Sequence, residues 1–233
     1  MKKLLLLSCV LLGTSMLSLA SPCPAAPTTY NNYMGSGFSC DIGDKTFFNF
    51  SYSASASGGA STIPPSGVVV TPITTPNNPG LLITGGFGVI SNQTQDEFFG
   101  FTVRVNLGGN PIDDITLLQL GSAFTGTGSA SIAETVCLGD TFADGCSGGT
   151  IVSLSTVDNS TLVKLSDHIT FAPVFVVDVV KDLELFGGPN GSAFVSGVVN
   201  EFSEVPTPEP GSLLTFGTGI VGVGILIRRK LKI

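Results

Sequence analysis

The sequence predicts an all-β protein: a jelly-roll-like β-sandwich followed by a single C-terminal transmembrane helix. Three observations lead to this fold class. Gly, Ser, Thr, Asn and Pro are abundant, and long helix-forming runs of Ala, Glu, Lys and Leu are missing. Apolar segments of strand length recur between Gly, Pro and Asn turns, about ten times in all. A run of seventeen residues without Asp, Glu, Lys or Arg, 211–227, lies near the end.

Residues 1–20 read as a secretory signal peptide. Lys2 and Lys3 form a basic start, an apolar run follows from Leu4, and small residues precede a predicted cleavage after Ala20. Cys23 invites a lipoprotein interpretation, but the preceding Pro22 is unsuitable for that signal, which requires a small residue there. The domain that remains, 21–205, is long enough for a hydrophobic core.

Strand signals recur along this domain, and residues 21–39 and 53–67 are predicted to be irregular. Residues 81–90 are read either as one bent strand or as two short ones, because Gly85-Gly86 marks a turn or a bulge. No helix is expected within the domain. The predicted strands are 46–52, 68–71, 81–90, 98–107, 112–120, 130–136, 151–156, 162–165, 174–180, 182–186 and 193–202.

Alternation predicts which aromatic side chains share a face of the sheet. In residues 46–52, Phe48, Phe50 and Tyr52 should lie on one face and Phe47 on the other. In the segment 98–107, alternate residues should face inward and Arg104 outward. The predicted inward set is Phe99, Phe101, Val103, Val105 and Leu107.

The domain is strongly acidic. Sixteen Asp and Glu stand against four basic residues, so its net charge is 4 − 16 = −12, compared with −7 for the whole chain. Such a charge provides no electrostatic surface for nucleic acid, so no nucleic-acid partner is expected. The basic residues are Lys45, Arg104, Lys164 and Lys181.

Four cysteines remain after removal of the signal peptide, and export makes disulfides plausible. Three pairings are possible. The local pairing, Cys23 with Cys40 and Cys137 with Cys146, is favoured. The second pair would close a short loop whose Gly and Asp residues form turns. A metal site is disfavoured because the sequence contains no C-x-x-C pair, and neither a metal nor a cofactor is expected.

Candidate catalytic or calcium-binding residues are few. His168 is the only histidine, and it is read as a turn residue between strands, although Ser166-Asp167-His168 could join a hydrolase site in space. Asp113-Asp114 should point to opposite faces of a strand, which does not suit an acid/base pair. The remaining calcium candidates are Asp140, Asp144, Asp158 and Asp167, which are interpreted as solvated loop residues.

The C-terminal segment, 206–233, has three parts. Pro208, Glu209 and Pro210 come first, and the uncharged run 211–227 follows. As a helix this run spans about 25 Å, near the lower limit for a bilayer core of about 30 Å, and the predicted transmembrane part is 212–227. Basic residues end the chain and should stay cytoplasmic; they include Arg228, Arg229 and Lys230.

This order of elements resembles the PEP-CTERM sorting signal of Gram-negative bacteria. The resemblance covers about 28 residues and rests on Pro208-Glu209-Pro210, the apolar segment and the basic end. It implies recognition by an exosortase-type transpeptidase, with cleavage near the motif. The precursor would be anchored in the inner membrane, and the product would reach the cell surface or the extracellular matrix, often in bacteria that make exopolysaccharide.

The sequence therefore predicts a non-enzymatic, exported surface protein. The alternative is a module that binds polysaccharide, or an adhesin, with calcium as a candidate helper. The absence of Trp and the presence of only three Tyr weaken that alternative, since sugar sites usually use exposed aromatic platforms. A secreted hydrolase is disfavoured because the chain has one histidine and no recognisable catalytic motif.

Overall fold

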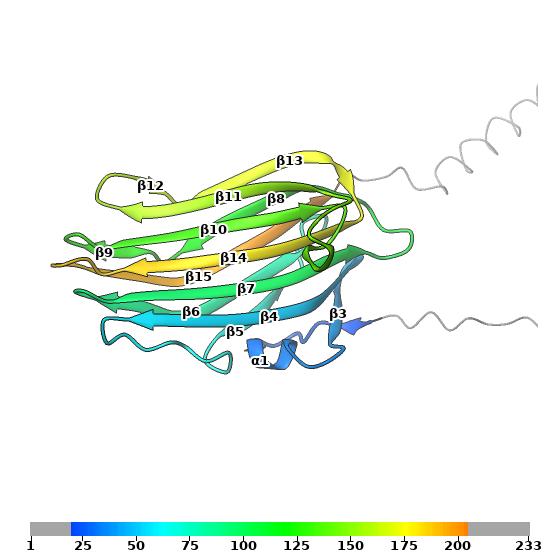
Figure 1. Ribbon diagram of the computed structural model, residues 1–233. Coiled ribbons are helices and arrows are strands. Elements are labelled where there is room, and N and C mark those ends of the chain that lie inside the picture. Colours follow the sequence, from blue (N-terminus) through cyan, green and yellow to red (C-terminus); the bar gives the residue numbers. More distant parts are fainter. Residues whose placement is uncertain (1–19, 205–233) are drawn as a thin grey trace, which may run out of the picture.

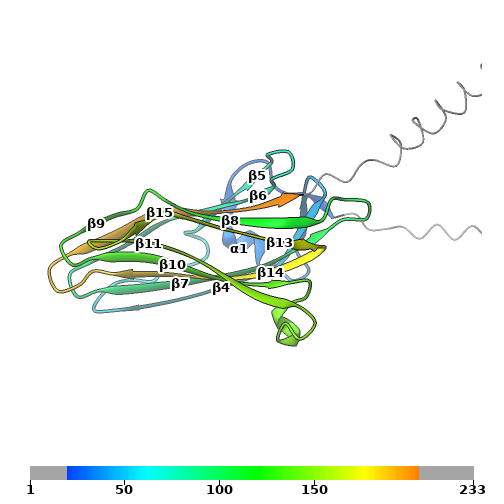
Figure 2. The same cartoon turned by 90° about the horizontal axis from the view of Figure 1, so that it is seen from above.

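The computed structural model describes residues 20–204, and these residues form two β-sheets packed face to face (Figures 1 and 2). One sheet has eight strands, in the order β1-β3-β4-β7-β14-β10-β11-β12. The other has seven, in the order β13-β8-β15-β6-β5-β2, with β9 paired to β15. We call them the eight-stranded and seven-stranded sheets. The all-β sandwich predicted from the sequence is confirmed.

The strands of the eight-stranded sheet are β1 (Ser21–Pro22), β3 (Ser39–Ile42), β4 (Lys45–Ser57), β7 (Thr94–Val105), β14 (Val176–Phe186), β10 (Ser129–Leu138), β11 (Thr150–Asn159) and β12 (Val163–Lys164). Those of the seven-stranded sheet are β13 (Ser166–Val174), β8 (Ile112–Leu120), β15 (Ser192–Glu204), β6 (Gly80–Ile90), β5 (Val69–Ile73), β2 (Thr28–Thr29) and β9 (Ala123–Thr125). Two short helices complete the described chain: α1 (Tyr30–Tyr33) and the 3-10 helix η1 (Phe142–Asp144).

The core lies between the sheets and is built from the side chains that the strands of both sheets point inward. Phe99, Phe101 and Phe202 are essentially unexposed there. The short helix α1 covers one side of this layer, where Tyr30 and Tyr33 pack against Phe50. The Tyr30 hydroxyl donates to the carbonyl oxygen of Gly100 at 3.0 Å. Residues 21–39, predicted to be irregular, therefore contain a helix that closes the core.

Two bulges change the pattern that simple alternation predicts. In β4 the register shifts between Phe48 and Ser51, and Asn49 takes a positive φ of 55°. Phe47 therefore joins Phe50 inside, and Phe48 lies outside. Arg104 Cζ lies over the Phe48 ring, 5.3 Å from its centroid. The predicted grouping of Phe48 with Phe50 was wrong because the extra residue reverses the faces.

The strand β6 is one continuous strand with an irregularity opposite Val195 and Gly197. This settles the open choice for residues 81–90: Gly85-Gly86 forms part of a bulge and does not end the strand. The inward-facing set predicted for residues 98–107 was wrong at its last member. Leu107 was expected to face inward, but β7 ends at Val105 and Leu107 is 95% exposed in the following turn.

The strand β13 was missed by the sequence analysis, which placed a turn around His168. β13 lies at the edge of its sheet and contains Pro173, which an edge strand tolerates because one side needs no ladder hydrogen bond. Its polar residues masked the weak alternation of Ile169 and Phe171. Pro72 likewise does not end β5, which continues to Ile73 and pairs there with β6.

Within residues 20–204, no helix has the length and apolar character needed to cross a membrane. The predicted transmembrane segment 212–227 lies outside the described residues, as does nearly all of the predicted signal peptide.

Candidate functional site

The strand β15 ends at Glu204, and only three residues separate Glu204 from Pro208. β15 is a central strand, paired with β6 on one side and with β8 on the other. Its end is held by further backbone bonds: Phe202 N–H donates to the Pro79 carbonyl at 3.0 Å, and Glu204 N–H donates to the Asn77 carbonyl at 3.1 Å. The folded domain is therefore ordered up to the residues that precede the Pro-Glu-Pro sequence.

The Glu204 side chain is also fixed, by a group that we call the Lys45 cluster: Asp44, Lys45, Asn110 and Glu204. Lys45 Nζ lies 2.8 Å from Glu204 Oε1 and 2.5 Å from Asp44 Oδ1. It also donates to the backbone carbonyl of Asn110 at 2.8 Å. The Lys45 side chain is fully buried and that of Glu204 is 5% exposed. Because Lys45 begins β4, this cluster joins the two sheets where β15 ends.

The charges of this cluster are matched to one another. Burial alone would raise the pKa of Asp44, but hydrogen bonds from Lys45 and from the Asn110 N–H, together with the Lys45 charge, hold that pKa below its usual value. Asp44 is therefore ionised in the folded protein at neutral pH. The cluster can fix the end of β15 electrostatically.

A cavity of about 300 Å³ lies beside this end of the sandwich. Asp44, Asn110 and Glu204 contribute to its wall, and the remaining lining comes from the β3–β4 turn and the β5–β6 loop. Its lining residues are Ile42, Gly43, Asp44, Thr74, Thr75, Pro76, Asn77, Pro79, Asn110 and Glu204. A partner that approaches the end of β15 would therefore meet a concave surface lined by both polar and apolar groups.

A second hollow lies on the outer face of the eight-stranded sheet. Its volume is about 270 Å³, and we call it the outer-face groove: Ser51, Ser53, Phe98, Gly100 and Val180, with Tyr52 and Phe99 beneath. Phe98 is 38% exposed, on the face of β7 opposite to that of its buried neighbour Phe99. Gly100 has no side chain, and the Ser51 hydroxyl lies where a Cβ of residue 100 would be.

Asp182 follows this groove along β14, opposite Phe98 in the strand register. Its Oδ1 is buried and accepts no hydrogen bond. Burial, with the neighbouring charges of Asp96 and Glu184, raises the pKa of Asp182. Among the described residues, the charged groups that shift this pKa, Asp96 and Glu184, are themselves negative.

The hydrolase candidates do not assemble. His168 is exposed on β13, and Asp167, the preceding residue of the strand, points to the opposite face. The Asp167 carboxylate binds Lys164 at 2.8 Å and accepts from the backbone N–H groups of Ser155 and His168. This arrangement stabilises a strand edge, and it engages the His168 backbone and not its imidazole.

The calcium candidates are spread over different elements. Asp140 accepts from the Gly148 N–H at 2.9 Å, Asp144 ends η1, and Asp158 is buried on β11. Asp113 and Asp114 lie in β8. Across the described part of the chain, no three His, Cys, Asp or Glu side chains come together in a way that could hold a metal ion.

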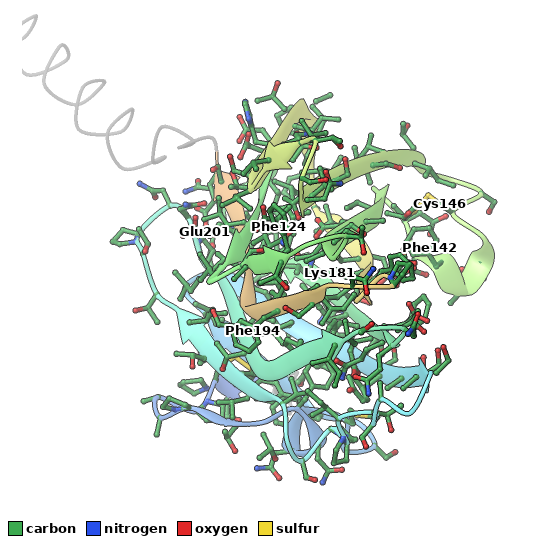
Figure 3. The ribbon with its side chains drawn as sticks, turned by 90° about the vertical axis from the view of Figure 1, so that its left-hand side faces the viewer. Phe124, Phe142, Cys146, Lys181, Phe194 and Glu201 are labelled. Atoms are coloured by element: carbon green, nitrogen blue, oxygen red, sulfur yellow. A yellow bond between two sulfur atoms is a disulfide. The ribbon has the colours of Figure 1, made fainter. Side chains whose placement is uncertain are left out.

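Both predicted disulfides are present. Cys23–Cys40 joins the N-terminal segment to β3, and Cys137–Cys146 closes the loop that contains η1. This loop projects away from the outer side of the eight-stranded sheet, as Figure 2 shows, and Figure 3 labels Cys146 and Phe142 in it. The local pairing was correct because each pair lies within one short stretch of chain.

The sorting residues named from the sequence lie outside the described residues, both Pro208, Glu209 and Pro210 and the basic residues Arg228, Arg229 and Lys230. Sequence reasoning missed the Lys45 cluster, whose members are far apart in the chain. For the other buried lysine, Lys181, the sequence did indicate that a buried partner is needed. Lys181 falls in the inward phase of β14, between Val179 and Leu183, where an unpaired charge is costly.

Comparison with known proteins gives one match at the C-terminus. The family model of the PEP-CTERM protein-sorting motif matches residues 206–230. The predicted resemblance is thus confirmed for this segment. No curated protein matches the chain.

Solved structures give matches to the domain itself. TmCBM61 in complex with β-1,4-galactotriose has 12% identity and a TM-score of 0.34, over 76% of this chain and 99% of that chain. The family 11 carbohydrate-binding module of Clostridium thermocellum has 8% identity and a TM-score of 0.26, over 67% of this chain and 91% of that chain. The CBM22-1 xylan-binding domain of Paenibacillus barcinonensis has 11% identity and a TM-score of 0.25, over 81% of this chain and 100% of that chain. Scores this low carry no conclusion about ligand.

Proposed function

We propose that this chain, which ends in a PEP-CTERM sorting motif, is an exported, non-enzymatic protein of the cell surface or extracellular matrix. An exosortase-type transpeptidase recognises the motif while residues 212–227 hold the precursor in the inner membrane. Residues 1–20 direct export, residues 21–205 form a jelly-roll-like cargo domain, and residues 206–233 are the sorting segment.

The observation that carries this proposal is the matched segment 206–230 directly after a fully ordered domain. From Glu204 to Pro208 the chain spans at most about 14 Å when extended. The processing enzyme would therefore work close to the end of β15, next to the cavity and the Lys45 cluster. This closeness supports the interpretation of residues 21–205 as the cargo that the tail delivers.

Replacing Pro208, Glu209 and Pro210 with alanine tests the sorting function. The full-length precursor should accumulate in the membrane fraction, because the recognised turn is gone while the apolar segment remains. Immunoblots of membrane, surface and medium fractions measure this. Pro189→Ala provides the control, since this exposed proline lies in the turn before β15, at the other end of that strand. Normal processing of the triple variant would refute exosortase recognition.

The outer-face groove supports a second candidate function, which is binding of extracellular polysaccharide. The partly exposed Phe98 lies in the groove with Ser51 and Ser53, and Asp182 is its partner in the strand register. Stacking on an aromatic ring together with hydrogen bonding is how sugar rings are commonly held. Retention of the protein on polysaccharide from the producing bacterium tests this, with and without a calcium chelator.

The matched variants for this experiment are Phe98→Ala and Phe194→Ala. Both side chains are similarly exposed, 38% and 43%, but Phe194 belongs to the other sheet, on the side away from the Cys146 loop in Figure 3. Loss of retention in Phe98→Ala alone would support binding in the groove. Absence of retention for the unaltered protein, or equal loss in both variants, would refute it.

A further inference from the structure

Three side chains with complementary chemistry meet inside the sandwich: Lys181 on β14, Glu134 on β10 and Asn200 on β15. We call them the Lys181 cluster. Lys181 and Glu134 are direct partners in the register of β10 and β14, so both come from the eight-stranded sheet. Asn200 comes from the seven-stranded sheet and reaches them across the core. Figure 3 labels Lys181 nearer the middle of the molecule than the Cys146 loop.

One carboxylate holds both of the other groups. Lys181 Nζ donates to Glu134 Oε2 and to Asn200 Oδ1. Asn200 Nδ2 donates to Glu134 Oε1 at 3.1 Å and to the Thr116 carbonyl oxygen at 3.1 Å. The lysine nitrogen therefore meets the Asn200 carboxamide at its oxygen, while the NH₂ of the same carboxamide is bound to the second oxygen of Glu134.

The surroundings exclude water. Lys181 is fully buried, and Glu134 and Asn200 are each 1% exposed. Lys181 Nζ lies 5.2 Å from the centroid of the Phe101 ring. Burial lowers the pKa of Lys181, while the Glu134 charge and hydrogen bond act in the opposite direction. Removing water in this way favours the neutral amine, which is the nucleophilic form of lysine.

A salt bridge with Glu134 alone would satisfy the lysine charge, so the third member needs a separate explanation. An amine, a carboxamide and a shared carboxylate are the reactants and the acid–base catalyst for amide exchange. We propose that Lys181 and Asn200 form an intramolecular isopeptide bond, promoted by Glu134. The bond joins Lys181 Nζ to Asn200 Cγ and links the two sheets covalently.

The three side chains supply every atom and proton that the reaction needs. Glu134 takes a proton from the Lys181 ammonium, and the neutral Nζ attacks Cγ of Asn200 to give a tetrahedral intermediate. Protonated Glu134 then passes its proton to the departing Nδ2, while the second proton lost by Nζ also moves to that group through the carboxylate. The C–Nδ2 bond breaks, the Cγ carbonyl re-forms, and the nitrogen leaves as ammonium. No oxidant, reductant or cofactor is needed, and the low-dielectric site strengthens each proton transfer.

The location gives the bond a mechanical role. Asn200 lies four residues before Glu204 on the last strand, so a pull on the C-terminal end of the domain loads β15 first. The bond would pass that load to β14 in the opposite sheet, and β15 could not slide out alone. The bond follows from the cluster itself and does not depend on exosortase sorting.

Protease digestion of the full-length chain, denatured and with its disulfides reduced, tests the proposal. Lys181 is the only Lys or Arg between Lys164 and Arg228. Trypsin cleaves after a free lysine and not after an acylated one. We expect no cleavage after Lys181, and a fragment lighter than its sequence mass by one ammonia. Cleavage after Glu184 and Glu201 should then yield a branched peptide that joins the Lys181 and Asn200 fragments.

Three variants assign the roles. Glu134→Gln should restore complete cleavage after Lys181 with no loss of ammonia, because the proton carrier is gone while size and shape stay. Asn200→Ala should do the same. Glu201→Gln, the next residue along β15 on its other face, should keep the bond. Cleavage after Lys181 in the unaltered protein would overturn the proposal, and this result does not depend on any variant folding. A bond that persists in Glu134→Gln would overturn the role of Glu134.

Discussion

Two of the four Lys and Arg side chains in residues 20–204 are fully buried, and different groups surround the buried nitrogen of each. Lys45 lies at the end of the sandwich, and Lys181 lies in its core. Lysine is almost never fully buried unless it is paired. Lys45 is paired with two carboxylates, Asp44 and Glu204, one of which is 29% exposed. Lys181 has one carboxylate, Glu134, and a carboxamide, and none of the three reaches water.

This difference separates an electrostatic contact from a reactive one. The carboxylates around Lys45 are poor electrophiles when ionised, and the lowered pKa of Asp44 keeps that side chain charged. The partner of Lys181 is a neutral carboxamide whose carbon can be attacked and whose nitrogen can leave. Both clusters connect the two sheets through β15. The Lys45 cluster does so reversibly, whereas the Lys181 cluster can do so covalently.

The largest expected effect comes from removing the core lysine. Lys181→Met should lower the free energy of unfolding by about 3–5 kcal/mol, because buried Glu134 loses the nitrogen that it binds and the link between β14 and β15 can no longer form. Lys45→Met should cost less, about 1–3 kcal/mol, since water can reach the Asp44 side of that cluster. Denaturant unfolding monitored by circular dichroism measures both. Equal costs for the two variants would contradict the distinction between them.

Acid should weaken the Lys45 cluster first. The pKa of Asp44 is lowered in the folded state, so its contribution to stability is fully present above its unfolded pKa of about 3.9. That contribution is lost as the pH falls through the lower, folded value. Amide hydrogen exchange at the end of β15 should therefore accelerate below about pH 4, before exchange around Lys181 does.

The matched variant for this measurement is Asp44→Asn. It should already show faster exchange at Glu204 at neutral pH, and its exchange should change less on acidification. If the unaltered protein and Asp44→Asn had the same pH dependence, Asp44 would not control the end of β15.

The smallest effect concerns a carboxylate that has no lysine. The raised pKa of Asp182 means that the folded protein favours its protonated form, so its ionisation costs stability as the pH rises. Asp182→Asn should raise the free energy of unfolding by about 0.5 kcal/mol at neutral pH, because a like charge beside Asp96 and Glu184 is removed. The gain should disappear in acid, where Asp182 is protonated.

Asp178→Asn is the control, because Asp178 accepts hydrogen bonds from Thr102 Oγ1 and from the Phe142 N–H, each at 2.8 Å. This variant should be less stable than the unaltered protein. A stabilising effect of Asp178→Asn would show that lowering the negative charge in general, and not the unpaired Asp182, is responsible.

Local patterns predicted those features that depend on neighbouring residues. Strands such as 112–120 and 193–202 were identified correctly because their alternation is strong, and both disulfides because each closes a short loop. The face of the sheet on which each side chain lies was less predictable. One extra residue at Asn49 reversed the faces of β4, and no feature of the alternation itself reveals a bulge. Pro173 and the polar start of β13 concealed an edge strand.

The sequence by itself determined the β-sandwich class and the C-terminal sorting motif, because both are written in contiguous residues. Only the tertiary structure decided which polar groups meet. Glu134, Lys181 and Asn200 lie 47 and 19 residues apart, and Asp44 and Asn110 are separated by 66. Strand register and the packing of two sheets bring such residues together. A lysine in an inward phase signals that a partner must exist, but the partner's identity is set by which strand lies opposite.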